Sequence, residues 1–253
     1  MVARALSRIQ SELSRAGLRG LFTAIYDRCV RWFGAYRELD KNRSFNNSIE
    51  LLSYTRTLAS GWFNPWQLDS EICVLIDRVR RLRPKVVLEI GTAGGGTLFM
   101  WTRVAAPDAL LISIDLPGGD VGGGYSGWRA PLYRRFALPG QKVTLLRGDS
   151  HDPGMVRKLD RLLSGRSVDF LFIDGDHAYD GVRQDHECYA RFVGHGGLIA
   201  FHDIHPGDDA TTEVPRYWRD VRHRLAGSEV IASTDQRGFG IGVYVVDASL
   251  PRC

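Results

Sequence analysis

Residues 86–97 read Val-Val-Leu-Glu-Ile-Gly-Thr-Ala-Gly-Gly-Gly-Thr, and this stretch decides the fold. A short apolar run that ends in glycines predicts a buried strand, followed by a tight turn and the start of a helix. Glycines at that place let the backbone approach a small ligand closely, at the edge of an open α/β sheet where nucleotides bind. The stretch therefore predicts a nucleotide-like cofactor, although a plain strand-to-helix turn would show the same pattern.

The turn departs from the dinucleotide-binding pattern GxGxxG at one position. Counted from Gly91, the first and last glycines are present, but Ala93 replaces the middle one. The middle glycine is the one that lets the backbone approach a pyrophosphate, so a methyl group there favours a cofactor without a pyrophosphate. A nucleoside cofactor such as S-adenosylmethionine fits this turn better than a dinucleotide.

Strands and helices alternate from residue 85 onward. Predicted strands cover residues 85–90, 110–115, 142–147, 168–173, 197–202, 228–233 and 240–246. Helices are predicted near residues 49–58, 67–82, 97–104, 129–137, 153–164, 178–192 and 213–225. This alternation predicts an α/β fold with a Rossmann-like parallel sheet covered on both faces. Only Thr234–Gly238 separates the last two strands, which predicts an antiparallel hairpin.

The overall composition is that of a globular protein, with 44% hydrophobic and 25% charged residues among 253. We expect an N-terminal helical extension over residues 1–60 and a cofactor-binding domain over residues 61–253. The four cysteines, at positions 29, 73, 188 and 253, show no zinc-finger or CxxC spacing, so we expect reduced thiols in a cytoplasmic protein. No apolar run approaches the ~20 residues of a transmembrane helix.

Basic residues are concentrated at the N-terminus. Residues 1–37 hold seven arginines against two acidic residues, a net charge of +5, whereas the remainder is close to neutral. Apolar residues recur there at helical spacing, so the segment can form amphipathic helices. Such an arm can lie on the inner membrane surface as a peripheral contact, cover the active site, or join copies in a homo-oligomer. The nearly neutral body argues against a nucleic-acid partner.

Polar residues follow the second and third predicted strands. Asp115 ends the second strand, where a carboxylate can accept hydrogen bonds from ribose hydroxyls. Asp149 and Ser150 end the third strand, where they can meet an adenine ring, while Asp152 can cap the next helix. A solvated loop carboxylate is the alternative for Asp115.

The fourth and fifth predicted strands end in a denser group of polar residues. Asp174 and His177 follow the fourth strand, and His202 and Asp203 follow the fifth. Parallel neighbours bring these ends together, and oxygen ligands with one imidazole suit Mg²⁺ or Mn²⁺ and can accept Fe²⁺ or Zn²⁺. We expect Asp174, His202 and Asp203 as metal ligands, with a hydrogen-bonded cluster without metal as the alternative.

Other polar and aromatic residues have simpler interpretations. We expect Asp180 and Asp185 to lie on a solvated helix face. We expect the remaining histidines to be structural or solvated, namely His151, His186, His195, His205 and His223. The glycine-rich segment Pro117–Trp128 is either a surface loop or a lid over the ligands. Tyr125, Trp128 and Tyr133 near it can stack on an acceptor or simply pack.

Taken together, residues 67–246 resemble the class I S-adenosylmethionine-dependent methyltransferases. The motifs are Leu88–Gly91 with Gly95 and Thr97, Ser113–Asp115, Gly148–Ser150, Phe172–His177 and Phe201–Asp203. Five parallel strands, a helix and a hairpin are the element order of this class. Within it, the chain is most similar to metal-dependent O-methyltransferases, in the group of macrolide-sugar O-methyltransferases and cephalosporin hydroxylase-like proteins that is also called methyltransferase family 24.

The resemblance implies a role for each matched residue. It places Glu89, Gly91 and Thr97, with Thr92 and Gly95 of the same turn, along the methionine and ribose end of the cofactor. It places Asp115 on the ribose, Asp149 and Ser150 against adenine, Asp174 beside the sulfonium and on the metal, and His177 as general base. Relatives such as catechol-type enzymes carry a carboxylate at the position of His202, so the metal ligands here carry less negative charge.

The expected activity is metal-assisted methylation of a hydroxyl group. The acceptor would be a sugar, a glycolipid or a natural product, with a catechol-like phenol as second choice. Three alternatives stay open: a metal-independent methyltransferase, a silent subunit that binds S-adenosylmethionine, and a hydroxylase-associated protein.

Overall fold

The computed structural model describes residues 26–39, 43–118, 123–208 and 212–247 and contains one seven-stranded sheet. The strands run in the order β3-β2-β1-β4-β5-β7-β6. Their bounds are β1 Val86–Ile90, β2 Leu110–Asp115, β3 Lys142–Arg147, β4 Val168–Ile173, β5 Val193–His202, β6 Ser228–Val230 and β7 Ile241–Val245. Strands β1 to β5 are parallel, and β7 is antiparallel to both β5 and β6, so the predicted sheet is confirmed.

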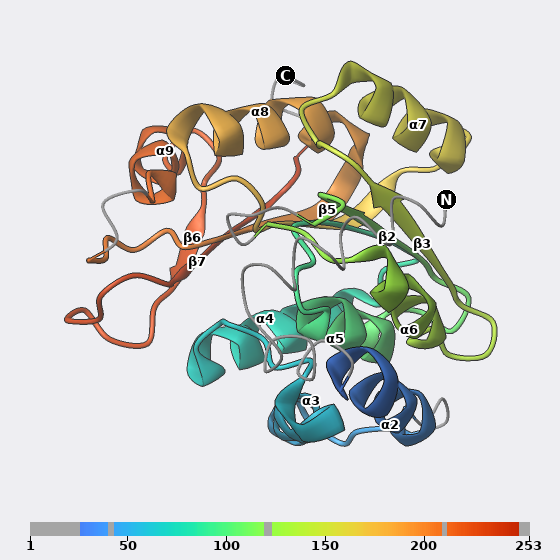
Figure 1. Ribbon diagram of the computed structural model, residues 1–253. Helices are drawn as coiled ribbons and strands as arrows, with labels where there is room; N and C mark the ends of the chain where they lie inside the picture. The colour runs from blue at the N-terminus through green and yellow to red at the C-terminus, as the bar shows by residue number, and fades with distance from the viewer. Residues whose placement is uncertain (1–25, 40–42, 119–122, 209–211, 248–253) are drawn as a thin grey trace, which may run out of the picture.

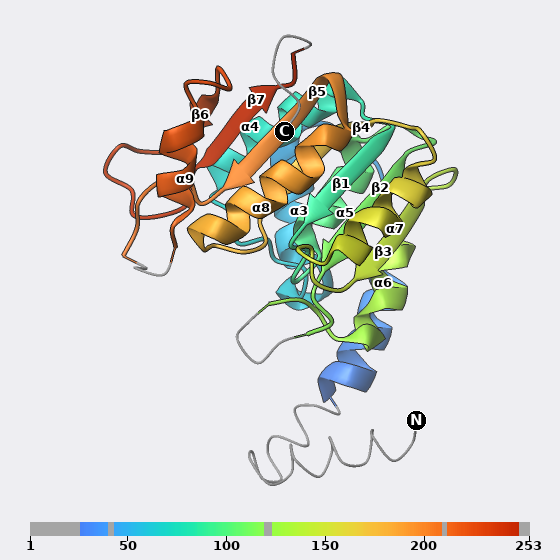
Figure 2. The same cartoon turned by 90° about the horizontal axis from the view of Figure 1, so that it is seen from above.

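Helices cover both faces of the sheet (Figure 1). One layer contains α2 Trp32–Glu38, α3 Ser48–Gly61, α4 Asp69–Leu82, α5 Gly96–Val104 and α6 Ala130–Arg135. The other contains α7 Pro153–Leu163, α8 Tyr179–Tyr189 and α9 Val214–Val221, and the short helices η1 Tyr26–Arg31, η2 Gly127–Arg129 and η3 Ala190–Phe192 complete the set. Seen from above, α7 and α8 run along the strands that they cover (Figure 2).

The strands separate two hydrophobic cores because alternate side chains point to opposite faces. In β1, Val87 packs with the core under α3 to α6, and Leu88 packs with the core under α7 to α9. In the register of the sheet, Leu88 pairs with Ile112 on one side and Leu171 on the other. Central strands buried on both faces read as continuous apolar runs, which explains why the sequence located β1, β2 and β4 within one residue, whereas β5 begins at Val193, four residues before its predicted start.

The predicted hairpin forms, but its connection is longer than Thr234–Gly238. Strand β6 ends at Val230 instead of residue 233, and residues 231–240 form the connection. Glu71, buried in α4, accepts hydrogen bonds from this connection: from Ala232 N at 3.1 Å, Gln236 Nε2 at 2.7 Å and Gly240 N at 2.9 Å. The loop is therefore held by α4, a contact that the local sequence pattern does not reveal.

The described part of the N-terminal extension packs on the domain. Ala35 of α2 and Leu51, Leu52 and Leu58 of α3 lie in the same buried cluster as Phe99 of α5. The first predicted amphipathic helix lies outside the described residues. None of the helices in the described ranges has the length and apolar character that a bilayer span requires.

Candidate functional site

The glycine turn lies against the end of β4. Gly91 has a left-handed φ of 83°, and a Cβ built on it would lie 1.9 Å from the carbonyl oxygen of Asp174. Real Cβ atoms do not approach a backbone oxygen this closely, so only glycine fits here. The backbone of the turn and the backbone of Asp174 are therefore in direct contact.

Asp115 holds the turn through backbone hydrogen bonds. Its Oδ2 accepts from the amides of Thr92 at 2.9 Å and Ala93 at 2.7 Å, and its Oδ1 accepts from Leu116 N at 2.7 Å. Burial raises the pKa of this carboxyl group, and the three amides partly offset that rise. A carboxylate has about four acceptor positions, so one remains for a ligand hydroxyl. The ribose contact of Asp115 stays a prediction.

Glu89 is fully buried below the turn. Its Oε2 accepts from Thr92 Oγ1 at 2.7 Å, and its Oε1 accepts from Trp101 Nε1 at 2.9 Å. Burial raises the pKa of Glu89 to about 7, although the side chains of Thr97, Thr92 and Trp101 lower it through hydrogen bonds. The contact of Glu89 with the cofactor remains a prediction, and the side chain links the turn to α5.

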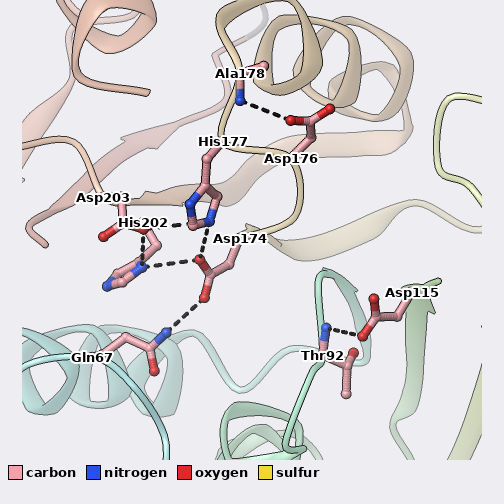
Figure 3. A network of polar contacts seen from close by, with 9 residues as sticks. All are labelled: Gln67, Thr92, Asp115, Asp174, Asp176, His177, Ala178, His202 and Asp203. Carbon is pink, nitrogen blue, oxygen red and sulfur yellow. Dashed lines mark hydrogen bonds and ion pairs between the residues drawn. The ribbon is translucent and has the colours of Figure 1, made fainter. Parts of the chain in front are cut away.

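Four titratable side chains meet where β4 and β5 end (Figure 3). His202 Nδ1 lies 3.1 Å from Asp174 Oδ1 and 3.3 Å from Asp203 Oδ2. His177 Nε2 lies 3.8 Å and 3.6 Å from the same two oxygens. Two imidazole groups therefore face one pair of carboxylates, and all four predicted residues are neighbours in space.

The two imidazole groups differ in exposure and charge. The side chain of His202 is 4% exposed, and that of His177 is 42% exposed. Burial alone would lower the pKa of His202, but the carboxylates of Asp174 and Asp203 raise it to about 10. The Asp174 carboxylate also raises the pKa of His177, against an opposing effect of burial. Burial would raise the pKa of Asp174, but His202 and His177 lower it to about 2.

These donor atoms suit a metal ion. Asp174, His177 and Asp203 each offer one ligand atom, all within 4.8 Å of one another. An ion bound at about 2.0–2.2 Å sets neighbouring ligand atoms roughly 2.9–3.6 Å apart. The measured separations of 3.1 to 3.8 Å among the four side chains are close to that range. The residues therefore fit an ion, and the group whose ligand atoms lie within 4.8 Å of one another contains His177 and not the predicted ligand His202.

Two further features of this cluster escaped the sequence. Gln67, buried just before α4, donates from Nε2 to Asp174 Oδ2 at 2.8 Å and so orients that carboxylate. Nothing near Gln67 in the sequence signals this role, because Asp174 is far away along the chain. Asp203 has a left-handed φ of 59°, which is uncommon outside glycine and is typical of functional sites.

Some expectations need correction. Asp185 is buried, not solvated, because this position of α8 faces Gly175; its Oδ1 lies 3.3 Å from His151 Nε2, and this contact raises the pKa of His151 to about 9. Asp180 is exposed as predicted. His186 is structural as predicted, since its nitrogens contact the hydroxyls of Tyr217 at 2.6 Å and Tyr244 at 2.7 Å.

The residues near the glycine-rich segment pack rather than face an open site. Tyr125 and Tyr133 are buried, with ring centroids 4.7 Å apart, and Trp128 is partly buried. Residues 119–122 lie outside the described ranges, so the lid stays a prediction. Asp149 accepts from His151 N at 2.8 Å, and the carbonyl of Ser150 accepts from the Tyr189 hydroxyl at 2.7 Å. Both residues stand at the end of β3, and their adenine contact is untested.

Comparison with known proteins is consistent with this geometry. One similar structure is the O-methyltransferase TomG from Streptomyces achromogenes, which is involved in tomaymycin synthesis and was solved with SAM. It aligns with a TM-score of 0.57 and 14% identity, and the alignment covers 86% of this chain and 96% of TomG. The fold is that of a class I methyltransferase. A Bacillus cereus O-methyltransferase solved with SAH aligns over 85% of this chain and 97% of its own, with a TM-score of 0.54 and 16% identity.

Sequence comparison finds a partial match. Residues 88–204 match the model of a family described as a methyltransferase domain. An uncharacterised protein of Acanthamoeba polyphaga mimivirus is 39% identical over 69 residues, which are 27% of this chain and 30% of that protein. The chain spans less than a third of the length of the curated relatives that it matches.

Proposed function

We propose that this protein transfers the methyl group of S-adenosylmethionine to a hydroxyl oxygen of a small molecule, assisted by a divalent metal. The observation that carries the proposal is that Asp174 contacts both the glycine turn and the polar cluster. Its backbone carbonyl lies against the cofactor turn at Gly91, and its side chain belongs to the polar cluster. A cofactor on the turn would therefore present its sulfonium beside the groups that can activate an acceptor.

The mechanism assigns different roles to the two histidines. His177 is the more exposed imidazole, so we assign its Nε2 to accept the proton of the acceptor hydroxyl. His202 is buried, and its Nδ1 contacts both carboxylates, so it would have to be neutral to coordinate an ion. Asp174, His202 and Asp203 would hold the metal, which when bound lowers the pKa of a hydroxyl and fixes its position. Much of the rate would come from alignment of oxygen, methyl group and sulfur.

The test of this mechanism is His177→Ala. We expect methyl transfer to fall about 10²- to 10⁴-fold, the usual contribution of a general base, while the Kd for S-adenosylhomocysteine stays the same. His195→Ala is the matched control, because His195 is exposed near the start of β5, at the opposite end of that strand from His202. Full activity of His177→Ala would remove His177 from the mechanism.

One observation favours a metal-independent reaction as a second candidate. The His202 imidazole lies within 3.3 Å of both carboxylates, and its raised pKa of about 10 keeps it charged at neutral pH. That charge can replace the positive charge of an ion. Activity measured after chelator treatment and after addition of Mg²⁺, Mn²⁺ or Zn²⁺ separates the two candidates, because only the metal-assisted enzyme loses and regains activity.

The acceptor, the cellular location and the role of the N-terminal arm are also proposals. We favour a sugar, glycolipid or natural-product hydroxyl as acceptor and a location in the cytoplasm. For residues 1–37 we favour a cover over the active site or a contact between copies in a homo-oligomer, with peripheral membrane contact as the alternative. Flotation of the full chain with vesicles that contain anionic lipid tests this contact. If the full chain and a chain lacking residues 1–37 both fail to float, the membrane contact is wrong.

A further inference from the structure

Arg129 holds its guanidinium group against two aromatic rings, and none of the described acidic residues pairs with it. Its Cζ lies 4.5 Å from the ring centroid of Trp62 and 5.7 Å from that of Trp128. Nη1 donates to the Tyr133 hydroxyl at 3.2 Å. No ion pair joins Arg129 to an acidic residue in the part of the chain that the structure describes. Since a guanidinium group has five N–H donors, most of its hydrogen-bonding capacity remains for a ligand.

This cation lies beside the second half of the glycine turn. The Tyr133 hydroxyl donates to the carbonyl of Ala93 at 2.7 Å, and a Cβ at Gly95 would lie 2.8 Å from the Tyr133 ring. The carbonyl of Trp62 lies 3.9 Å from the Cβ position of Gly94. Arg129 therefore flanks residues 93–95, whereas Asp174 flanks residue 91.

The charges around the turn leave one part of the proposed cofactor without a partner. Asp115 and Asp174 are acidic and suit ribose hydroxyls, the sulfonium and the amino group, but they repel a carboxylate. The methionine part of S-adenosylmethionine ends in a carboxylate, and the planar fork of arginine matches a carboxylate with two parallel hydrogen bonds. We propose that Arg129 binds the carboxylate of the methionine part of the cofactor, an inference that rests on the proposed function.

The surrounding aromatic residues preorganise Arg129 for this role. The rings of Trp62 and Trp128 lie 5.5 Å apart, and Trp32 Nε1 of α2 donates to the Trp128 carbonyl at 3.0 Å. Cation–π contact with tryptophan holds a guanidinium group without neutralising its charge. The N-terminal extension thus supports a cofactor contact that no residue of the extension makes directly.

Comparing the affinities of two ligands tests this contact. S-adenosylhomocysteine carries the carboxylate, whereas 5′-methylthioadenosine lacks the whole amino-acid part. We expect Arg129→Met to weaken S-adenosylhomocysteine about 10- to 100-fold in calorimetric titration, the usual loss for a charged hydrogen-bonded pair, and to leave 5′-methylthioadenosine within about twofold. Arg129→Lys should give an intermediate loss because it keeps the charge but not the fork.

Arg135→Met is the matched control. Arg135 is the last residue of α6, which begins directly after Arg129, and it also stacks on a ring, with its Cζ 4.0 Å from the Tyr36 centroid. It contacts the extension rather than the turn. It should change neither affinity. An equal loss of both ligands in Arg129→Met would show a structural role and overturn the inference, and so would no loss of either. If the wild-type protein binds neither ligand, the proposed function itself fails.

Discussion

The acidic residues of the turn and those of the polar cluster have different partners. Around the turn, Glu89 and Asp115 accept hydrogen bonds at 2.7 to 2.9 Å from uncharged donors of neighbouring residues. In the cluster, Asp174 and Asp203 face imidazole groups 3.1 to 3.8 Å away. Uncharged donors at short distance fix a backbone, whereas titratable groups at longer distance leave room for a ligand and a proton.

Because of this difference, we expect substitutions at the turn to affect stability and substitutions in the cluster to affect activity. Changes at the turn should mainly alter the free energy of unfolding, because they leave buried donors without acceptors. Changes in the cluster should mainly alter turnover, because the groups there are the proposed metal ligands and the proposed general base.

The largest expected effect is that of Asp174→Asn. It removes the charge that both imidazole groups face, so we expect kcat/KM to fall about 10³-fold with the fold retained, as measured by methyl transfer and circular dichroism. Asp169→Asn is the control at the opposite end of β4, where Asp169 Oδ2 accepts from Lys85 N at 2.7 Å and Val86 N at 2.9 Å. That variant should lose stability and keep activity, and the reverse pattern would contradict the separate roles of the two groups of acidic residues.

Glu89→Gln tests the turn through pH. The pKa of Glu89 is raised from 4.5 to about 7, so its neutral form stabilises the folded state fully below pH 4.5, and this contribution is lost as the pH rises to 7. The loss amounts to about 3 kcal/mol in the wild type, and it is absent in the variant.

Urea unfolding of both proteins at pH 4.5 and pH 8 measures this difference. The stability of the wild type relative to the variant should fall by that amount between the two pH values. Glu187→Gln, an exposed residue of α8, serves as the control. A relative stability of Glu89→Gln that does not change with pH would contradict the raised pKa.

Gln67→Leu should have a smaller effect on activity. It removes the hydrogen bond to Asp174 Oδ2 while keeping most of the buried volume. Loss of such a supporting contact to a metal ligand costs about 10-fold in activity or metal affinity, and both can be measured. Unchanged values for both would show that the contact serves packing alone.

The smallest expected change is a shift of the acid limb of the pH–rate profile. The Asp174 carboxylate, together with Asp203, raises the pKa of His177, so the limb in kcat/KM should have its midpoint above 6.5. Asp203→Asn should move it toward lower pH by up to about one unit. A midpoint that stays in place would mean that His177 does not set the limb.

The sequence predicts the sheet well because its signals are local. Val86–Ile90 and Leu110–Asp115 are continuous buried runs, and their ends mark the edge where the polar residues gather. The same rule brings Asp174 and Asp203 together without knowledge of any contact. Residues that act across long separations leave no such signal.

Asp185 and Gln67 illustrate what the sequence conceals. The burial of Asp185 depends on the rotation of α8 relative to Gly175, and helical periodicity in a short polar helix does not fix that rotation. Gln67 reaches Asp174 only because residues 62–67 fold over the turn. Glutamine before a helix is common, so nothing distinguishes this one from a surface residue.

The path of residues 62–67 has a consequence for any attempt to shorten this protein or to exchange parts of it. A Cβ at Gly96 would lie 2.2 Å from the carbonyl of Phe63, so the segment and the first turn of α5 are fitted to each other. The recognisable family region begins only at residue 88. A chimaera that takes only the region from residue 88 onward would carry the predicted ligands and Gly96 but not Gln67 or Trp62, and the segment that replaces residues 62–67 would have to fit against Gly96. The segment that must be transferred to keep this site intact therefore begins before residue 88, where the match to the family model begins.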